Sequence, residues 1–424
     1  MYIHHPATHD LTVASGKGRS GARHSGELQT KLTMWLGVTR HRLGALLGLV
    51  VVIFCPGPAR AHDASVWGGL FRTRDAGATW VGLNPGSFVS GAMALAVSPV
   101  DPHHLLLATD TGVSRSRNGG RDWTLEAPDV LGGPAFAAAF DVDGQRALIT
   151  ARLALFAHED GRWSAVRAPA GSLPARILVA RPVRGSVYLA GQRGLYRSDD
   201  WGQSWLDVGR ALPAPTSVRA VVVSRTDAQS VYVVADGRCW VSADAGRHWD
   251  SRGEGAPEGR MEALVPDPGD ANRLWSVADG QVLRSDDEGR RWRPIGQRVP
   301  EAPLRAHALV VADQVLVLAT DRGVYRSPDG GARWMLASDS LPAHLDAGML
   351  TRDPADRDTF YAGFAVTPSD ALAERELEAA GMLAQLTPDK LAKALPFLTL
   401  VLLAAVAGAW RLATYVAASR SAPR

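Results

Sequence analysis

The sequence contains little cysteine, little lysine and little net charge. Its two cysteines are Cys55 and Cys239, and Cys55 lies in a segment, residues 34–61, that we expect to be removed on export. A disulfide within the mature chain is therefore excluded, and Cys239 is expected to be a buried thiol. The formal net charge is only +3. So small an excess argues against a nucleic-acid partner.

Tryptophan, in contrast, recurs at a regular spacing. Seven complete or partial copies of the phrase S/T-x-D-x-G-x-x-W place a tryptophan every 40 to 44 residues. Repeats of this length that hold several short strands are typical of β-propeller blades, because one small sheet cannot bury both of its faces alone. We therefore predict an all-β, seven-bladed propeller over residues 62–368.

Each copy of this phrase, called the box below, is expected to form a turn. Its aspartate can cap turn amides, its glycine adopts a positive φ, and its tryptophan begins the next strand and packs between sheets. The third copy is two residues shorter than the others, so its turn must be built differently. The structural box residues are Asp75, Gly77, Trp80, Asn118, Gly120, Trp123, Asp160, Trp163, Asp200, Gly202, Trp205, Asp244, Gly246, Trp249, Asp287, Gly289, Trp292, Asp329, Gly331 and Trp334.

The two ends of the predicted propeller complete one another. The first box has no complete pair of strands before it, while residues 349–351 and 359–363 look like two strands with no box after them. We expect strands from both termini to share one blade, since this closes the ring and removes exposed sheet edges.

The boxes resemble the Asp-box, or BNR, repeats of sialidases, sortilin-type receptors, some xyloglucan hydrolases and the photosystem II assembly and stability factor family. The resemblance covers about residues 63–366. In those families the box is a structural hairpin at the blade periphery. The resemblance therefore implies a fold and leaves the function to be argued from other residues.

Two apolar segments outside the propeller predict export and membrane attachment. Arg40 and Arg42 precede an apolar run and the small-residue pattern Ala59-Arg60-Ala61, as in a signal peptide over residues 34–61. Residues 1–33 are then an over-called start or a disordered extension. Residues 394–418 begin with an uncharged run of 17 residues and are expected to form a transmembrane helix, with a buried core helix as the alternative.

The remaining terminal segments complete this topology. Residues 369–393 are expected to form a helical stalk, and residues 419–424 a short basic tail on the inner side. The sequence thus predicts a single-pass protein of the cell membrane, with the propeller on the periplasmic or extracellular side and the helix as its contact with the membrane.

Arginines occur in two sets. One occupies the same strand position before the box in five blades and is expected to pair with neighbouring blades: Arg72, Arg115, Arg197, Arg284 and Arg326. The other lies at the starts of the predicted inner strands: Arg176, Arg219, Arg260, Arg305 and, at the equivalent place in one blade, His307. Inner strands line the central channel, so the second set would form a basic arc at its mouth. The alternative is ordinary solvated arginine.

Residues for catalysis or metal binding are scarce. A sialidase-like site needs a tyrosine nucleophile, yet every tyrosine of the predicted propeller falls at a repeated strand position. A carboxylate pair among Glu254, Glu258 and Glu262 is an open alternative to a solvated loop, because such pairs have no fixed spacing. His62 and the pair His103-His104 provide too few metal ligands. We predict no cofactor.

Two functional interpretations follow. The first is a non-catalytic scaffold that binds a protein or peptide, as an assembly or quality-control factor for a membrane or exported protein. The photosystem II assembly family resembles this chain in using an arginine-rich propeller face, by type of surface and without a shared motif. The alternative is a carbohydrate-active or glycan-binding propeller.

Overall fold

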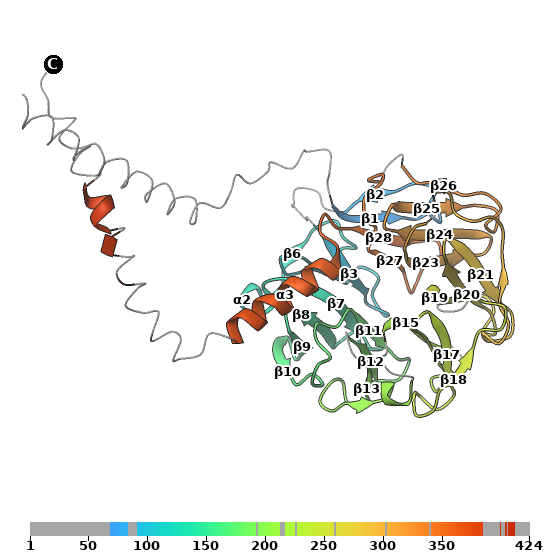
Figure 1. Ribbon diagram of the computed structural model, residues 1–424, viewed down its shortest axis with the longest axis horizontal. Helices are drawn as coiled ribbons and strands as arrows, with labels where there is room; N and C mark the ends of the chain where they lie inside the picture. The colour runs from blue at the N-terminus through green and yellow to red at the C-terminus, as the bar shows by residue number, and fades with distance from the viewer. Residues whose placement is uncertain are drawn as a thin grey trace, which may run out of the picture. The chain divides into compact units, whose positions relative to one another are not determined.

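The structure, a computed structural model, describes residues 68–384 except 84–90, 192–193, 213–216, 225–226, 258–259, 302 and 339–340, together with 399, 403–404 and 406–411. Its strands form seven four-stranded antiparallel sheets arranged in a ring (Figure 1). The predicted seven-bladed all-β propeller is confirmed.

The first two strands of each blade form the centre of the ring. The innermost strands are β3 (Ala92–Val97), β7 (Ala135–Phe140), β11 (Ile177–Ala180), β15 (Val218–Val223), β19 (Met261–Pro266), β23 (Ala306–Ala312) and β27 (Met349–Arg352). The second strands are β4 (Leu105–Thr109), β8 (Ala147–Ala151), β12 (Val187–Ala190), β16 (Val231–Ala235), β20 (Leu274–Ala278), β24 (Val315–Thr320) and β28 (Phe360–Phe364). The second strands are apolar and almost entirely buried because adjacent sheets cover both of their faces.

The outer half of each blade carries the box between its two strands. The third strands are β5 (Val113–Ser116), β9 (Ala154–Glu159), β13 (Leu195–Ser198), β17 (Arg238–Ser242), β21 (Gln281–Ser285), β25 (Gly323–Ser327) and β1 (Gly69–Thr73). The outermost strands are β6 (Thr124–Leu125), β10 (Arg162–Val166), β14 (Leu206–Asp207), β18 (Asp250–Arg252), β22 (Arg293–Pro294), β26 (Met335–Leu336) and β2 (Val81–Gly82). Most of these begin one residue after the box tryptophan and are only two residues long.

One blade is built from both ends of the chain, as predicted. Its strand order is β2-β1-β28-β27, and β1 pairs antiparallel with β28 from Gly69 opposite Phe364 to Thr73 opposite Phe360. Phe71 and Phe364 also meet edge to face, with ring centroids 5.5 Å apart. This pairing removes the free edge that either terminal hairpin would otherwise expose.

Six of the seven boxes fold into the same turn. In the blade of Ser242, its hydroxyl donates to Asp244 Oδ1 at 2.8 Å and accepts from Gly246 N at 2.7 Å, while Asp244 Oδ1 accepts from His248 N at 2.9 Å. Gly246 has φ 92°, and Ala245 before it has φ 59°. Asn118 takes the place of aspartate in the second box and accepts from Asp122 N at 2.9 Å.

The third box is a different turn, as its shorter sequence predicts. Glu159 pairs directly with Arg162, so Asp160 and Gly161 alone make the connection between β9 and β10. Both have positive φ, 49° and 77°. This is the geometry of a two-residue hairpin whose twist matches that of its strands, and Asp160 is a turn residue here without the capping role of the other box aspartates.

Five of the seven box tryptophans form a hydrogen bond through Nε1 to the preceding blade, whereas Trp80 Nε1 donates to Gly77 O of its own box and Trp292 Nε1 has no partner among the described residues. Trp123 Nε1 donates to Leu83 O at 2.7 Å, and Trp249 Nε1 donates to Val208 O at 2.8 Å. In each pair the acceptor immediately follows the outermost strand of the preceding blade. The indole rings therefore pack between sheets, as predicted.

The first arginine set pairs with neighbouring blades in three of its five positions. Arg72, Arg197 and Arg326 donate to a box carbonyl of the next blade, at 2.7, 2.8 and 2.9 Å. The prediction is wrong for the other two, which find partners in their own blade. Arg115 binds Glu126 and His104, and Arg284 lies over Trp275 and pairs with Asp286.

Within residues 68–384, the described residues include three helical segments: α2 (Pro128–Leu131), the 3-10 helix η1 (Gly209–Ala211) and α3 (Ser369–Ala384). α3 falls within the expected stalk, residues 369–393. Among the described residues, no helix is long and apolar enough to span a membrane. Residues 1–33, the expected signal peptide 34–61, the tail 419–424 and most of the expected transmembrane segment 394–418 lie outside the described residues.

Candidate functional site

One mouth of the central channel is surrounded by residues at the starts of the innermost strands. The pairing of β15, β19 and β23 with their second strands skips Arg219, Glu262 and His307. Each is a β-bulge, an extra residue that bends the strand and redirects its side chain. Equivalent bulges at Met93 and Phe136 are apolar. The charged part of the mouth is therefore confined to a few neighbouring blades.

Arg176 and Arg305 come together at this mouth through one carboxylate. Arg176 precedes β11 and Arg305 precedes β23, in different blades. Asp370 of α3 forms ion pairs with both: its Oδ1 pairs with Arg176 Nη1, and its Oδ2 lies 3.5 Å from Arg305 Nη1. In the view of Figure 1, α3 is drawn in front of the blades that contain β3, β7 and β8.

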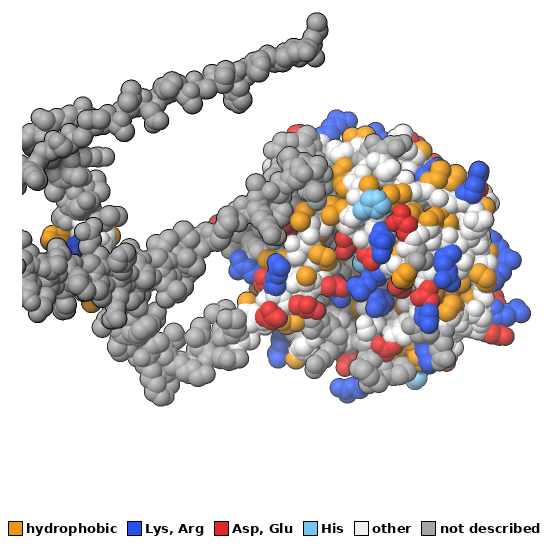
Figure 2. Space-filling view, turned by 45° about the horizontal axis from the view of Figure 1, so that its top comes forward, with side chains coloured by type: hydrophobic (Ala, Val, Ile, Leu, Met, Phe, Trp, Pro, Cys, Tyr) orange, Lys and Arg blue, Asp and Glu red, His pale blue; other side chains and the backbone are white. Residues whose placement is uncertain are grey.

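Arg219 adds a third positive charge to this group. Partial burial, together with the charges of Arg219 and Arg305, lowers the pKa of Arg176 from its usual value, and Glu374 opposes the shift. Arg219 itself is exposed. We call Arg176, Arg219 and Arg305 the arginine mouth. In Figure 2, basic and acidic side chains lie side by side on the visible face of the propeller.

The other two residues of the predicted arc have carboxylate partners of their own. Arg260 Nη1 donates to Asp279 Oδ2 at 2.5 Å, and His307 Nε2 lies 3.0 Å from Asp346 Oδ1. Asp279 follows β20 and Asp346 precedes β27. The structure thus brings three of the five residues together and pairs the remaining two separately.

Glu262 is an acidic residue of the mouth that the predicted arc does not include. It accepts a hydrogen bond from Ala306 N at 2.9 Å, and burial raises its pKa. With Arg219, Arg260 and Asp279 it lines a cavity of about 350 Å³. Its place as the second residue of its innermost strand, where Arg219 and His307 also lie in theirs, is the sequence signal that identifies it.

The predicted glutamate group does not form a carboxylate pair in the described residues. Glu254 follows the outermost strand β18, where its backbone bonds to Arg290 and Trp292 of the next box. Glu262 instead lies on the innermost strand of the following blade, and Glu258 is outside the described residues. No three His, Cys, Asp or Glu side chains are grouped for a metal ion in the part of the chain that the structure describes.

Two tyrosines of the propeller, Tyr325 and Tyr361, are structural residues. Tyr325 donates to Glu301 at 3.3 Å and Tyr361 donates to Asp353 at 3.2 Å, and both rings are at most 2% exposed. Burial and these carboxylates raise the pKa of Tyr325 and of Tyr361 to about 12. A nucleophilic tyrosine requires the opposite shift, because only the phenolate attacks.

The opposite mouth of the channel holds a larger hollow, of about 730 Å³. It is lined by the ends of the innermost strands, including Val97 and Phe140, and by the turns that follow them, which contribute Val142, Pro99, Pro182, Pro268 and Pro354. Sequence reasoning did not identify it, although the proline recurring in these turns is a visible signal.

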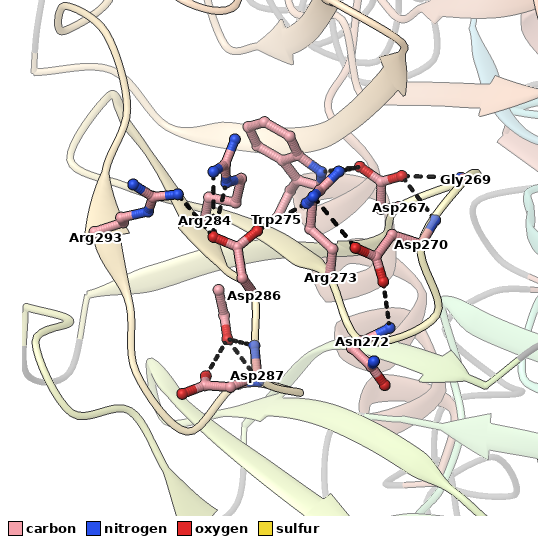
Figure 3. A network of polar contacts seen from close by, with 12 residues as sticks. Asp267, Gly269, Asp270, Asn272, Arg273, Trp275, Arg284, Asp286, Asp287 and Arg293 are labelled. Carbon is pink, nitrogen blue, oxygen red and sulfur yellow. Dashed lines mark hydrogen bonds and ion pairs between the residues drawn. The ribbon is translucent and has the colours of Figure 1, made fainter.

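A dense polar network lies in the blade of β20 and β21 (Figure 3). Asp286 accepts from Arg273 Nε and Arg293 Nη2, both at 2.8 Å, and pairs with Arg284 at 3.2 Å. Partial burial opposes ionisation, but these hydrogen bonds and the charge of Arg284 lower the pKa of Asp286 to about 2. Every arginine of the network has a carboxylate partner, so the network stabilises the blade and leaves no cation free.

Comparison with known proteins identifies the fold but no family. No family model and no curated protein matches the sequence. Among solved structures, YCF48 bound to D1 peptide has a TM-score of 0.51 and 17% identity, over 66% of this chain and 94% of that one. YCF48 from Cyanidioschyzon merolae has a TM-score of 0.49 and 15% identity, over 65% and 96%.

A GH74 xyloglucanase from Xanthomonas campestris is more distant, with a TM-score of 0.40 and 18% identity over 59% of this chain and 52% of that one. The likeness to YCF48 bound to D1 peptide shows a shared fold. The resemblance of the boxes to the Asp-box repeat stays an interpretation of the sequence.

Proposed function

We propose that this propeller is a non-catalytic scaffold or assembly factor that binds an acidic segment of a partner protein at the arginine mouth. One observation carries the proposal: the Asp370 carboxylate is held between Arg176 and Arg305, which belong to different blades. A carboxylate on a peptide segment is therefore a ligand that fits this mouth. Arginine suits the role because its guanidinium is always charged and presents several donors in a fixed plane.

The comparison with YCF48 supports a peptide partner. That protein shares the fold and was solved bound to D1 peptide. For the present chain, the local charge is the stronger argument, since Arg219 adds to Arg176 and Arg305 while Arg260 is neutralised by Asp279. Clustered charge of one sign steers an oppositely charged partner and fixes its position.

The test is crosslinking of the full chain in its native membrane, followed by mass spectrometry. We expect protein partners crosslinked through acidic segments, and their recovery should fall at least about tenfold in the double variant Arg176→Glu and Arg219→Glu. The matched control is Arg121→Glu with Arg247→Glu, which makes the same charge change at two exposed, equivalent box positions. Equal recovery from both double variants, or binding to a glycan array without any protein partner, would contradict the proposal.

We further propose that the propeller works on the outward side of a membrane. The support is the predicted signal peptide, residues 34–61, and the apolar segment 394–418. Protease added to intact cells with a permeable outer layer should then digest the propeller and spare the tail 419–424. Recovery of the intact chain in the soluble cell fraction would contradict this location.

A further inference from the structure

The helix α3 has the composition of a ligand for the arginine mouth. Its 16 residues contain four acidic side chains, Asp370, Glu374, Glu376 and Glu378, against the single basic Arg375. Asp370, Ala373, Glu374 and Leu377 follow the i, i+3, i+4, i+7 spacing of one helix face.

That face is directed to the propeller. Asp370 pairs with Arg176 and Arg305, the charge of Glu374 acts on Arg176, and Ala373 between them is 4% exposed. The side chain of Glu374 is exposed, as are those of Arg375 and Glu378. Two of the three arginines of the arginine mouth therefore form ion pairs with a carboxylate of the same chain.

The contact is one that a partner can displace. The side chains of Asp370, Arg176 and Arg305 are 48%, 45% and 54% exposed, so water and salt screen both ion pairs. The helix is nevertheless always near, because only four residues separate the end of β28 at Phe364 from Ser369. A short tether gives an effective concentration of about millimolar, enough for a weak contact to stay formed.

We propose that α3 is a tethered competitor that covers the arginine mouth until an acidic partner segment displaces it. This proposal rests on the proposed function, since it identifies the element that regulates the same site. It predicts that the natural chain binds a partner less tightly than a chain whose arginine mouth is uncovered. Weakening the contact of α3 with the mouth should therefore increase the affinity for a separate partner molecule.

Trypsin cleavage at Arg375 tests whether α3 is docked, without any partner. A 16-residue helix is only marginally stable alone, so release from the propeller lets it unfold and be cut. In the full chain, Asp370→Asn should raise the cleavage rate about three- to tenfold. Arg305→Gln should do the same while leaving the sequence of α3 unchanged, and Glu378→Gln is the matched control that should have no effect.

Binding of a labelled peptide with the sequence of residues 369–384 tests the competition. The full-length Asp370→Asn chain should bind this probe about three- to tenfold more tightly than the natural chain or Glu378→Gln. The gain should shrink in 1 M salt, because the pairs that it removes are screened.

Two outcomes separate this proposal from the proposed function. If the Asp370→Asn chain binds the probe no better than Glu378→Gln and is cut no faster at Arg375, the competitor is overturned while the mouth can still bind partners. If Arg176→Glu with Arg219→Glu leaves probe binding unchanged in the Asp370→Asn background, the mouth is not the binding site and both proposals fail.

Discussion

Arg326 Nε donates to the carbonyl of Ala76 at 2.9 Å, a hydrogen bond between residues 250 positions apart. It joins the blade of β23, β24, β25 and β26 to the blade that β1, β2, β27 and β28 form. At two other seams between blades, the carbonyls at the equivalent box position, Gly119 O and Ala245 O, accept from Arg72 and Arg197. In the seam where Val241 replaces the arginine, Arg252 from β18 donates to Glu288 O at 2.8 Å instead. The seam bond therefore recurs even where its donor comes from another strand.

Removing this donor should weaken the seam. Arg326→Ala leaves the Ala76 carbonyl without its charged partner, so we expect the free energy of unfolding to fall by about 1–3 kcal/mol. Urea unfolding followed by tryptophan fluorescence measures the change. Arg247→Ala, on an exposed box position, should stay within about 0.5 kcal/mol of the natural chain. Equal effects of the two variants would show that the seam bond contributes nothing.

Alanine substitutions at two turn glycines, Gly161 and Gly246, distinguish the cost of a strained backbone from the cost of a steric clash. Gly246 and Gly161 both have positive φ, 92° and 77°. A Cβ on Gly246 would lie 2.9 Å from Val208 Cβ, whereas a Cβ on Gly161 would meet no atom within 4 Å. Gly161→Ala should therefore cost about 1–2 kcal/mol for the left-handed backbone alone.

Gly246→Ala carries the same strain together with the clash, which adds about 1–3 kcal/mol. Thermal unfolding of both variants gives the comparison. A Gly161→Ala chain that is the less stable of the two would contradict the turn geometry described for the boxes.

Phe364 is the aromatic residue at which the last strand meets the first. It is fully buried and packs edge to face against Phe71 of β1. Phe364→Ala should destabilise the propeller by about 3–5 kcal/mol, because it leaves a cavity in the blade that closes the ring. Leu125→Ala, at a side chain that is 57% exposed, should have little effect. A loss below 1 kcal/mol for Phe364→Ala, measured by urea unfolding, would contradict this role in closure.

His104 should make stability depend on pH. Its Nε2 lies 2.8 Å from Arg115 Nη1, and its ring packs against Phe140. Burial, with the positive charges of Arg117 and Arg115, lowers the pKa of His104 to about 4. In the unfolded chain the pKa of this histidine is about 6.5. Between about pH 4 and pH 6.5 the unfolded state is therefore protonated at His104, whereas the folded state is not. Stability is therefore complete above pH 6.5 and decreases as the pH falls toward about 4, by about 1–3 kcal/mol.

The measurement is the urea midpoint between pH 4 and pH 7. His104→Gln keeps an acceptor for Arg115 but cannot be protonated, so the decline should become smaller. His158, whose pKa burial also lowers, should account for part of what remains. His103→Gln, at a mostly exposed ring, is the control and should leave the profile unchanged.

Local patterns in the sequence predict the features of this fold that repeat. The box turn and the sharing of one blade between residues 69–73 and 360–364 depend on short segments, and the structure agrees with them. Interaction partners that lie far apart in the sequence cannot be predicted from such local patterns. Arg115 could not be assigned to Glu126 and His104 from its repeat position, because its equivalents Arg72 and Arg197 bind the next blade.

The candidate site shows the same limit. Its arginines follow from the periodicity of the innermost strands, and the β-bulges explain why Arg219 and His307 reach the mouth. Which of them stays available depends on acidic residues from other hairpins and from α3. Asp279 neutralises Arg260, and Asp370 joins Arg176 to Arg305. No periodic pattern contains these pairs.

The pairing of β1 with β28 also dictates an order of events during synthesis. The hairpin of β1 and β2 is made first, yet the strand that completes its sheet ends at Phe364, about 300 residues later. Until then the hairpin has no neighbouring strand to pair with. It is therefore at best marginally stable, as isolated two-stranded hairpins are in water. The blade that is begun first is therefore the last to become complete, and a chain that stops before Phe360 should remain an open arc with two exposed sheet edges.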